Sequence, residues 1–151
     1  FTADGHNPKY SDGRGDMLPN STETALNILD NNSKGFFLMV EASQIDWGGH
    51  DNNTDYIVEE LLDFNRSIEV AMDFAKENPK TLVIVTADHE TGGMGLNGGS
   101  LTDHNVDAGY TTGGHTGVMV PVFAFGPGAE KFRGIYENTD VFEKMKELYG
   151  F

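Results

Sequence analysis

The stretch Thr81-Leu82-Val83-Ile84-Val85-Thr86-Ala87-Asp88-His89-Glu90-Thr91-Gly92-Gly93 indicates the fold more directly than any other part of the chain. Its apolar run has no polar alternation, which is typical of a strand buried on both faces of a helix-covered parallel sheet. The run ends abruptly in an acid and an imidazole. Because ligands of open α/β sheets bind beyond the carboxyl ends of the strands, this placement predicts metal binding or catalysis.

A second apolar run, Phe36 to Glu41, also ends in an acid and leads into a loop over residues 42–50. Between the two runs, apolar residues recur at helical spacing from Tyr56 to Asn78, and Asn78-Pro79 ends the pattern. A strand, a helix and a strand in this order predict a right-handed βαβ unit with parallel strands. We therefore expect an α/β protein with three layers, α/β/α, around a mostly parallel central sheet.

The other segments complete a single domain over residues 1–151. Residues 1–20 carry turn signals and are expected to form a loop or arm, and residues 21–30 a short helix. The glycine-rich segment 94–114 is expected to be a surface loop. Residues 118–125 suggest a strand that Pro121 moves to an edge or bulge, and residues 140–149 a closing helix capped by Thr139. The acid-rich face of the central helix, from Glu59 to Glu77, is expected to be solvated.

Composition narrows the classes of partner and of metal site. The chain has 151 residues, a formal net charge of −14 and no cysteine. Nucleic acid and anionic membranes would be repelled, and thiolate zinc sites and cysteine nucleophiles are excluded. No run is long enough to insert into a membrane, and there is no signal-peptide apolar region. The first residues look like a processed or excised end.

Three histidines with neighbouring glycines stand at loop positions next to strands: His50, His89 and His115. Each alone is more often a structural hydrogen-bonding residue, but together with nearby acids they indicate a metal site. Imidazole with carboxylate suits zinc, and carboxylate alone suits magnesium. We do not expect His6 or His104 to be ligands, and Glu90 is expected to be a structural hydrogen-bond acceptor.

Three motifs together carry a specific resemblance. They are Val40-Glu41-Ala42-Ser43-Gln44-Ile45-Asp46-Trp47-Gly48-Gly49-His50, Thr86-Ala87-Asp88-His89-Glu90-Thr91-Gly92-Gly93 and Gly114-His115-Thr116-Gly117. They resemble the metal-binding motifs of the alkaline phosphatases, in the order in which that family carries them. The resemblance runs from about Leu18 to the end of the chain, and it implies an alkaline-phosphatase-like fold that is incomplete.

The resemblance also implies roles for individual residues. Asp46, His50 and His115 match the ligands of a first zinc ion, Asp88 and His89 match two ligands of a second zinc ion, and Glu41 matches a ligand of a neighbouring magnesium ion. Trp47 stands where the family varies near the phosphate. It either tunes the phosphate site or packs the loop.

Several residues of the family's site have no match in this chain. They are the serine nucleophile, the arginine that clamps the phosphate, a bridging aspartate and the remaining magnesium ligands. The chain thus resembles the C-terminal part of an alkaline phosphatase. The implied activity is zinc-dependent hydrolysis of phosphate monoesters through a phosphoserine intermediate whose serine lies outside this chain, so the chain alone is expected to be inactive.

Two alternatives stay open at this stage. The first is another enzyme of the same superfamily, of the phosphoglycerate mutase, phosphodiesterase or sulfatase type. The second is a metal-binding module without catalysis. The resemblance further implies a periplasmic or extracellular location, and a sheet without its upstream strands should expose an edge, which predicts a homo-oligomer.

Overall fold

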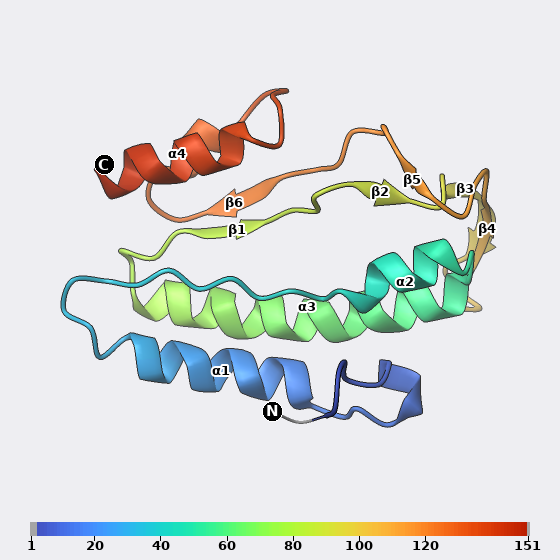
Figure 1. Ribbon diagram of the computed structural model, residues 1–151, viewed down its shortest axis with the longest axis horizontal. Helices are drawn as coiled ribbons and strands as arrows, with labels where there is room; N and C mark the ends of the chain where they lie inside the picture. The colour runs from blue at the N-terminus through green and yellow to red at the C-terminus, as the bar shows by residue number, and fades with distance from the viewer. Residues whose placement is uncertain (1–2, 151) are drawn as a thin grey trace.

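The structure is a computed structural model that describes residues 3–150. The first two residues of the expected arm lie outside that range. Figure 1 shows strands β1 (Val83–Val85) and β6 (Phe123–Phe125) between helix α3 (Thr54–Glu77) on one side and helix α4 (Asp140–Tyr149) on the other. Helix α1 (Met17–Leu29) packs on the opposite face of α3. The layers therefore follow the expected α/β/α order.

Helix α3 is the long central element and confirms the prediction from apolar spacing. Asn53 caps its N-terminus, because the side-chain oxygen accepts a hydrogen bond from the backbone N–H of Tyr56 at 3.1 Å. Tyr56 and Ala75, near its two ends, are both buried. The predicted closing helix is also confirmed as α4, although no hydrogen bond from the Thr139 side chain caps it.

Helix α1 begins four residues earlier than the sequence predicted, at Met17 rather than Ser21. Pro19 lies in its first turn and is buried. A proline is tolerated there because the first N–H groups of a helix have no partner within the helix. The assignment of residues 17–20 to the arm was therefore wrong, and the arm ends at residue 16, after a short 3₁₀ turn at Tyr10–Asp12 (η1).

The expected parallel pairing is not formed among the described residues. Strand β1 pairs with β6 in the antiparallel sense, with Val83 opposite Phe125 and Val85 opposite Phe123. A parallel neighbour requires a crossover, usually a helix, and the chain between β1 and β6 contains none. Residues 36–43 alternate between half-buried and exposed positions like a strand, but they pair with no strand of the described residues. Phe36 packs instead against Phe74 of α3, with ring centroids 6.0 Å apart.

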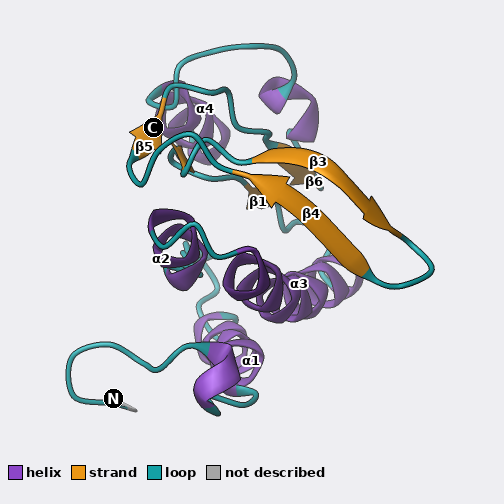
Figure 2. Ribbon diagram, turned by 90° about the vertical axis from the view of Figure 1, so that its right-hand side faces the viewer, coloured by secondary structure: helices purple, strands orange, loops and turns teal. Residues whose placement is uncertain are grey.

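Two further segments differ from the expectation of loops. Residues 44–50 form helix α2 (Gln44–His50), which packs against α3. The glycine-rich segment forms an antiparallel hairpin of β3 (Gly95–Ser100) and β4 (Asn105–Gly109), which Figure 2 shows as a projecting ribbon. Short strands β2 (Glu90–Thr91) and β5 (His115–Thr116) form a third ladder, and a 3₁₀ turn, η2 (Ala129–Phe132), precedes α4.

The acid-rich face of α3 is only partly solvated, contrary to the sequence prediction. Glu60 and Asp63 are each 1% exposed. Arg14 of the N-terminal arm binds both, with its Nη2 2.5 Å from Oε2 of Glu60 and 2.8 Å from Oδ2 of Asp63. Helical periodicity identified the face, but it gave no sign of a cation from outside the helix that would cover it.

Large apolar side chains remain exposed beside the strand layer. Phe37 and Met39 of the extended segment are 60% and 72% exposed, and Phe123 of β6 is 64% exposed. The same holds for Val118 and Met119 before β6. The strand layer of this three-layer α/β/α fold thus leaves large apolar side chains uncovered. None of the helices in residues 3–150 has the length and apolar character that a membrane span needs.

Candidate metal centre

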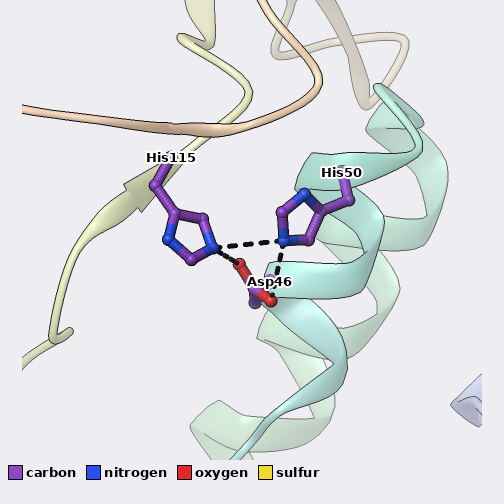
Figure 3. A group of neighbouring side chains, drawn as sticks. All are labelled: Asp46, His50 and His115. Atoms are coloured by element: carbon purple, nitrogen blue, oxygen red, sulfur yellow. Dashed lines mark hydrogen bonds and ion pairs between the residues drawn. The ribbon is translucent and has the colours of Figure 1, made fainter.

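Helix α2 supplies two of the candidate ligands. Asp46 and His50 are four residues apart, so both project from one face of the helix. Nε2 of His50 lies 3.3 Å from Oδ2 of Asp46. Figure 3 shows the two side chains converging on His115, which reaches them from a separate strand.

Strand β5 brings His115 to this helix. Its partner strand β2 places Thr91 opposite His115, and Thr91 in turn touches α2. Nε2 of His115 lies 3.2 Å from Nε2 of His50 and 3.5 Å from Oδ1 of Asp46. His50 and His115, which are 65 positions apart in the sequence, therefore lie side by side next to Asp46.

The three donors lie close enough together to share one zinc ion. One donor atom from each of Asp46, His50 and His115 lies within 4.8 Å of the other two. Bonds of about 2.1 Å at a tetrahedral zinc ion would separate neighbouring donors by about 3.4 Å. The two Nε2 atoms are 3.2 Å apart, and each faces a different oxygen of Asp46, His50 at 3.3 Å from Oδ2 and His115 at 3.5 Å from Oδ1. All three side chains are at least one-third exposed, so an ion could reach them from solvent.

Neighbouring groups orient the ligands. Nδ1 of His50 lies 2.7 Å from the carbonyl oxygen of Gly113, so a proton on Nδ1 leaves Nε2 free to bind a metal ion. The hydroxyl of Thr91 donates to Oδ1 of Asp46. Both contacts are of the kind that fixes a metal-binding side chain in one orientation.

Gly49 permits the close approach of α2 to β2. A Cβ atom at Gly49 would lie 2.9 Å from both Cβ and the carbonyl oxygen of Thr91, closer than real contacts allow. Gly48 faces α3 in the same way, because its Cβ would lie 3.0 Å from the backbone nitrogen of Ile57. Two glycines cost helix stability of about 1 kcal/mol each, and here they allow α2 to pack on both neighbours.

Asp88 and His89 lie beside this group but outside the three-residue cluster. The ring of His89 stacks on that of His115, with centroids 3.6 Å apart and an interplanar angle of 20°. Oδ2 of Asp88 lies 3.3 Å from Nε2 of His89, and the Asp88 side chain is 84% exposed. The two candidate ligand sets are thus adjacent, with His89 and His115 in contact.

Glu41 and Trp47 are not brought into the cluster. Glu41 is exposed at the end of the extended segment that leads into α2. Trp47 is 38% exposed and packs edge-on against the ring of His6, with centroids 4.6 Å apart. His104 lies in the turn of the β3–β4 hairpin.

Glu90 has the structural role that the sequence suggested. Its carboxylate accepts hydrogen bonds from the hydroxyl of Thr116 and from the backbone N–H groups of Gly93 and Met94. The hydrogen bond from Thr116, together with those from Met94 and Gly93, holds the pKa of Glu90 below its ordinary value. Glu90 therefore fastens β2 to β5, the strands that carry Thr91 and His115.

Sequence reasoning missed Thr91 as a part of the site. The signal was present, because Thr91 follows His89 by two residues, and residues two apart in an extended segment face the same side. The role of the Gly113 carbonyl could not have been predicted in this way, because every residue has a backbone carbonyl and the residue type does not show which one accepts a hydrogen bond.

Comparison with known proteins identifies the family. The family model described as alkaline phosphatase matches residues 2–106 and 99–150. The chain belongs to the alkaline phosphatase family. Among curated relatives, alkaline phosphatase 4 of Bacillus subtilis (strain 168) is 33% identical over 85% of this chain, and the alkaline phosphatase of Escherichia coli (strain K12) is 33% identical over 95% of it.

Solved alkaline phosphatase structures share the fold. The enzyme from the Antarctic bacterium TAB5 matches 94% of this chain with a TM-score of 0.86 and 44% identity. A histidine variant of TAB5 alkaline phosphatase with magnesium bound matches all of it, with a TM-score of 0.91 and 42% identity. The chain spans less than half the length of these relatives, from 34% to 46% of each.

Proposed function

We propose that this chain is the zinc-binding portion of an alkaline phosphatase that hydrolyses phosphate monoesters. The observation that carries the proposal is the convergence of Asp46, His50 and His115, whose donor atoms lie within 4.8 Å of one another, in a chain of this family. These residues would hold a first zinc ion, Asp88 and His89 would contribute to a second, and Glu41 would contribute to a magnesium site.

The residues of the chain have distinct tasks in this proposal. Bound zinc would supply a Lewis acid for a phosphate oxygen and would lower the pKa of a bound hydroxyl group. Asp46 and His50, fixed on one helix face, and His115, fixed by the β2–β5 ladder, set the position of the ion. Thr91 and the carbonyl of Gly113 hold Asp46 and His50 in the binding orientation.

The chain alone would lack turnover. In the proposed reaction a serine outside this chain forms the phosphoserine intermediate, and an arginine outside it clamps the phosphate. Within the chain, Arg14 is committed to Glu60 and Asp63, and Arg66 lies 2.6 Å from Asp16. Without nucleophile and clamp, both the covalent step and the positioning of substrate are lost.

Membership of the alkaline phosphatase family also suggests a location, a substrate and an oligomeric state for the protein. We propose a periplasmic or extracellular location and a phosphate monoester as the small-molecule partner, while the net charge of −14 argues against nucleic acid. The exposed Phe37, Met39 and Phe123 support a homo-oligomer, because large apolar side chains left in water favour association. Sedimentation of the chain should show association that increases with concentration, and a monomer at every concentration would contradict it.

The test is elemental analysis of zinc and magnesium in the purified chain, paired with hydrolysis of p-nitrophenyl phosphate at alkaline pH. The chain and its His104→Ala variant should each retain about one zinc ion, and a variant with His50→Ala and His115→Ala should lose it. None of the three should turn over substrate. Zinc-dependent turnover by the chain alone would contradict the assignment of the nucleophile, and equal zinc in all three would contradict the ligand assignment.

Assays of the full-length protein distinguish the proposed function from two alternatives. An enzyme of the phosphodiesterase or sulfatase type would prefer a diester or a sulfate ester over a monoester in a direct comparison of kcat/KM. A metal-binding module without catalysis would hydrolyse none of them. The contact between His89 and His115 favours the phosphatase over a module with one metal, because it places two ligand sets side by side.

A further inference from the structure

The N-terminal arm, residues 3–16, lies against helix α2, which carries Asp46 and His50, and against helix α3, on which α2 packs. Figure 1 shows it beside α3, and Asn7 and His6 of the arm contact residues of α2. The arm contributes no metal ligand in the function proposed above. Its contacts nevertheless run in a continuous series from the buried face of α3 to Trp47, the residue that follows Asp46.

Arg14 anchors the arm to α3. Its side chain is 6% exposed and binds two carboxylates, Glu60 and Asp63, whose side chains are 2% and 0% exposed. Its Nη1 also donates to the carbonyl oxygen of Pro8 at 3.1 Å, so the guanidinium joins the arm to itself as well as to the helix. Glu60 further accepts a hydrogen bond from the backbone N–H of Tyr10 at 2.7 Å.

Buried charges of this kind hold the arm firmly. Burial alone would lower the pKa of Arg14, but the hydrogen bonds and charges of Glu60 and Asp63 together raise it above its ordinary value. The guanidinium presents its donors as a rigid fork that matches two carboxylates, a geometry that the single ammonium group of lysine does not reproduce.

Gln44 connects the arm to the start of α2. Its Nε2 donates to the carbonyl oxygen of Asn7 at 2.6 Å, and its Oε1 accepts a hydrogen bond from the hydroxyl of Tyr56 on α3. Gln44 is 6% exposed. One buried amide therefore ties the arm, α2 and α3 together, two residues before the candidate ligand Asp46.

His6 completes the series at Trp47. Its ring lies edge-on to the indole at 74°, with centroids 4.6 Å apart, the arrangement that aromatic rings prefer. Trp47 is 38% exposed and shares α2 with Asp46 and His50. The arm thus covers one side of the indole that stands next to the candidate metal ligands.

We propose that the N-terminal arm is a brace for the metal-binding helix, in which Arg14 is the anchor and His6 is a positioning residue for Trp47. Through Gln44 and Trp47 the brace holds α2 in the orientation that presents Asp46 and His50 to His115. The effect on the metal centre rests on the function proposed above. The effect on Trp47 does not depend on any metal.

The chain carries its own reporter for this proposal, because Trp47 is its only tryptophan. Quenching of Trp47 fluorescence by acrylamide measures how far the indole is covered. We expect His6→Ala to increase the quenching constant and shift the emission to longer wavelength, since the covering ring is lost. The matched control is His104→Ala, in the hairpin turn, which should leave both unchanged.

Arg14→Lys tests the anchor, with Arg133→Lys, an exposed arginine, as its control. The hydrogen bonds of Arg14 go to Pro8, Glu60 and Asp63 rather than to Trp47. If the arm acts as a brace, Arg14→Lys nevertheless increases the quenching of Trp47. An arginine that only stabilises the fold would lower the melting temperature and leave quenching in the folded protein unchanged. That result would overturn the proposal, and so would unchanged quenching in His6→Ala. If Arg14→Lys does not fold, the His6→Ala variant decides.

Zinc titration adds the consequence for the metal centre. We expect Arg14→Lys to weaken zinc binding by about 10-fold, as displacement of orienting groups around a metal site does. Unchanged zinc affinity together with increased quenching would restrict the brace to Trp47 and overturn its role in holding the ligands. If the unaltered chain binds no zinc, the proposed function fails in this chain, while the quenching results still decide whether the arm braces Trp47.

Discussion

The hydroxyl of Thr91 lies 2.5 Å from Oδ1 of Asp46 and joins strand β2 to the metal-binding helix. The same hydroxyl is 3.2 Å from Nδ1 of His89. One uncharged side chain therefore touches a residue from each of the two candidate ligand sets. Its removal should disturb metal binding without removing any ligand.

Replacement of Thr91 by valine tests this relationship. The change keeps the shape of the side chain but removes the donor, so Asp46 loses the contact that fixes its carboxylate. We expect zinc affinity, measured by competition with a chromophoric chelator, to fall about 10- to 100-fold. Thr91→Ser should retain most of the affinity, and Thr102→Val, in the hairpin turn, should change nothing. Equal affinities in the valine variant and the unaltered chain would contradict an orienting role.

Gly49 is the second test of how α2 meets β2. Gly49→Ala would place a methyl group against Cβ and the carbonyl of Thr91, and backbone cannot move aside cheaply. The expected loss is about 1–3 kcal/mol in the free energy of unfolding, measured with urea. Gly95→Ala meets no atom within 4 Å and should stay within about 0.5 kcal/mol of the unaltered chain. If the free energy of unfolding of Gly49→Ala equalled that of the unaltered chain, α2 and β2 would have to be further apart than in this structure.

The buried carboxylates of α3 predict a large effect of a small change. Glu60→Gln removes the charge that faces Arg14 while keeping the shape of the side chain, and it leaves the cation under-compensated next to Asp63. We expect a loss of about 3 kcal/mol in the free energy of unfolding. Glu69→Gln, on an exposed position of the same helix, should cost less than about 0.5 kcal/mol. Similar values for the two variants would mean that the Arg14 network contributes little.

The contact between α4 and η2 predicts a dependence of stability on pH. Lys131 lies 2.6 Å from Glu147, and its hydrogen bond and charge lower the pKa of Glu147 from its ordinary value of 4.5. A lowered pKa in the folded state means that the stabilisation is present above that ordinary value and is lost as the pH falls through the lowered one. Because the Glu147 side chain is 64% exposed and that of Lys131 37%, solvent screens the pair and the effect is small.

Thermal unfolding at several pH values measures this contribution. The difference in melting temperature between the unaltered chain and Glu147→Gln should be present at pH 7 and should shrink as the pH falls below 4.5. Glu137→Gln, at an exposed position before α4, serves as the control. A difference that stays constant with pH would show that Glu147 acts through packing and not through its charge.

The elements predicted well from sequence are those whose evidence is local. The long apolar stripe of α3 and the short one of α4 each fix a helix within the segment itself. Helix α2 was missed because Gly48 and Gly49 oppose helix formation on their own and become favourable only where Ile57 and Thr91 approach closely. The β3–β4 hairpin was missed because glycines occupy many of its positions, so the alternation of apolar and polar side chains that indicates a strand is absent.

Strand pairing could not be read from the sequence. The run Phe36 to Glu41 has the composition of a buried strand, but a strand is defined by its neighbours, and the described residues offer it none. More of the site's spatial arrangement could be anticipated, because the motif residues lie at the ends of elements that meet. Asp46, His50 and His115 do converge, whereas Glu41 and Asp88 remain exposed. The metal-binding roles of all five residues stay predictions.

The most direct test of the central claim is X-ray absorption at the zinc edge, on the chain loaded with one equivalent of zinc. If Asp46, His50 and His115 hold one ion, the spectrum will show two imidazoles at about 2.0–2.1 Å with oxygen ligands completing a tetrahedral shell. His115→Ala will then show a single imidazole, and His104→Ala will match the unaltered chain. A first shell of oxygen alone, or the same two imidazoles after His115→Ala, would contradict the account.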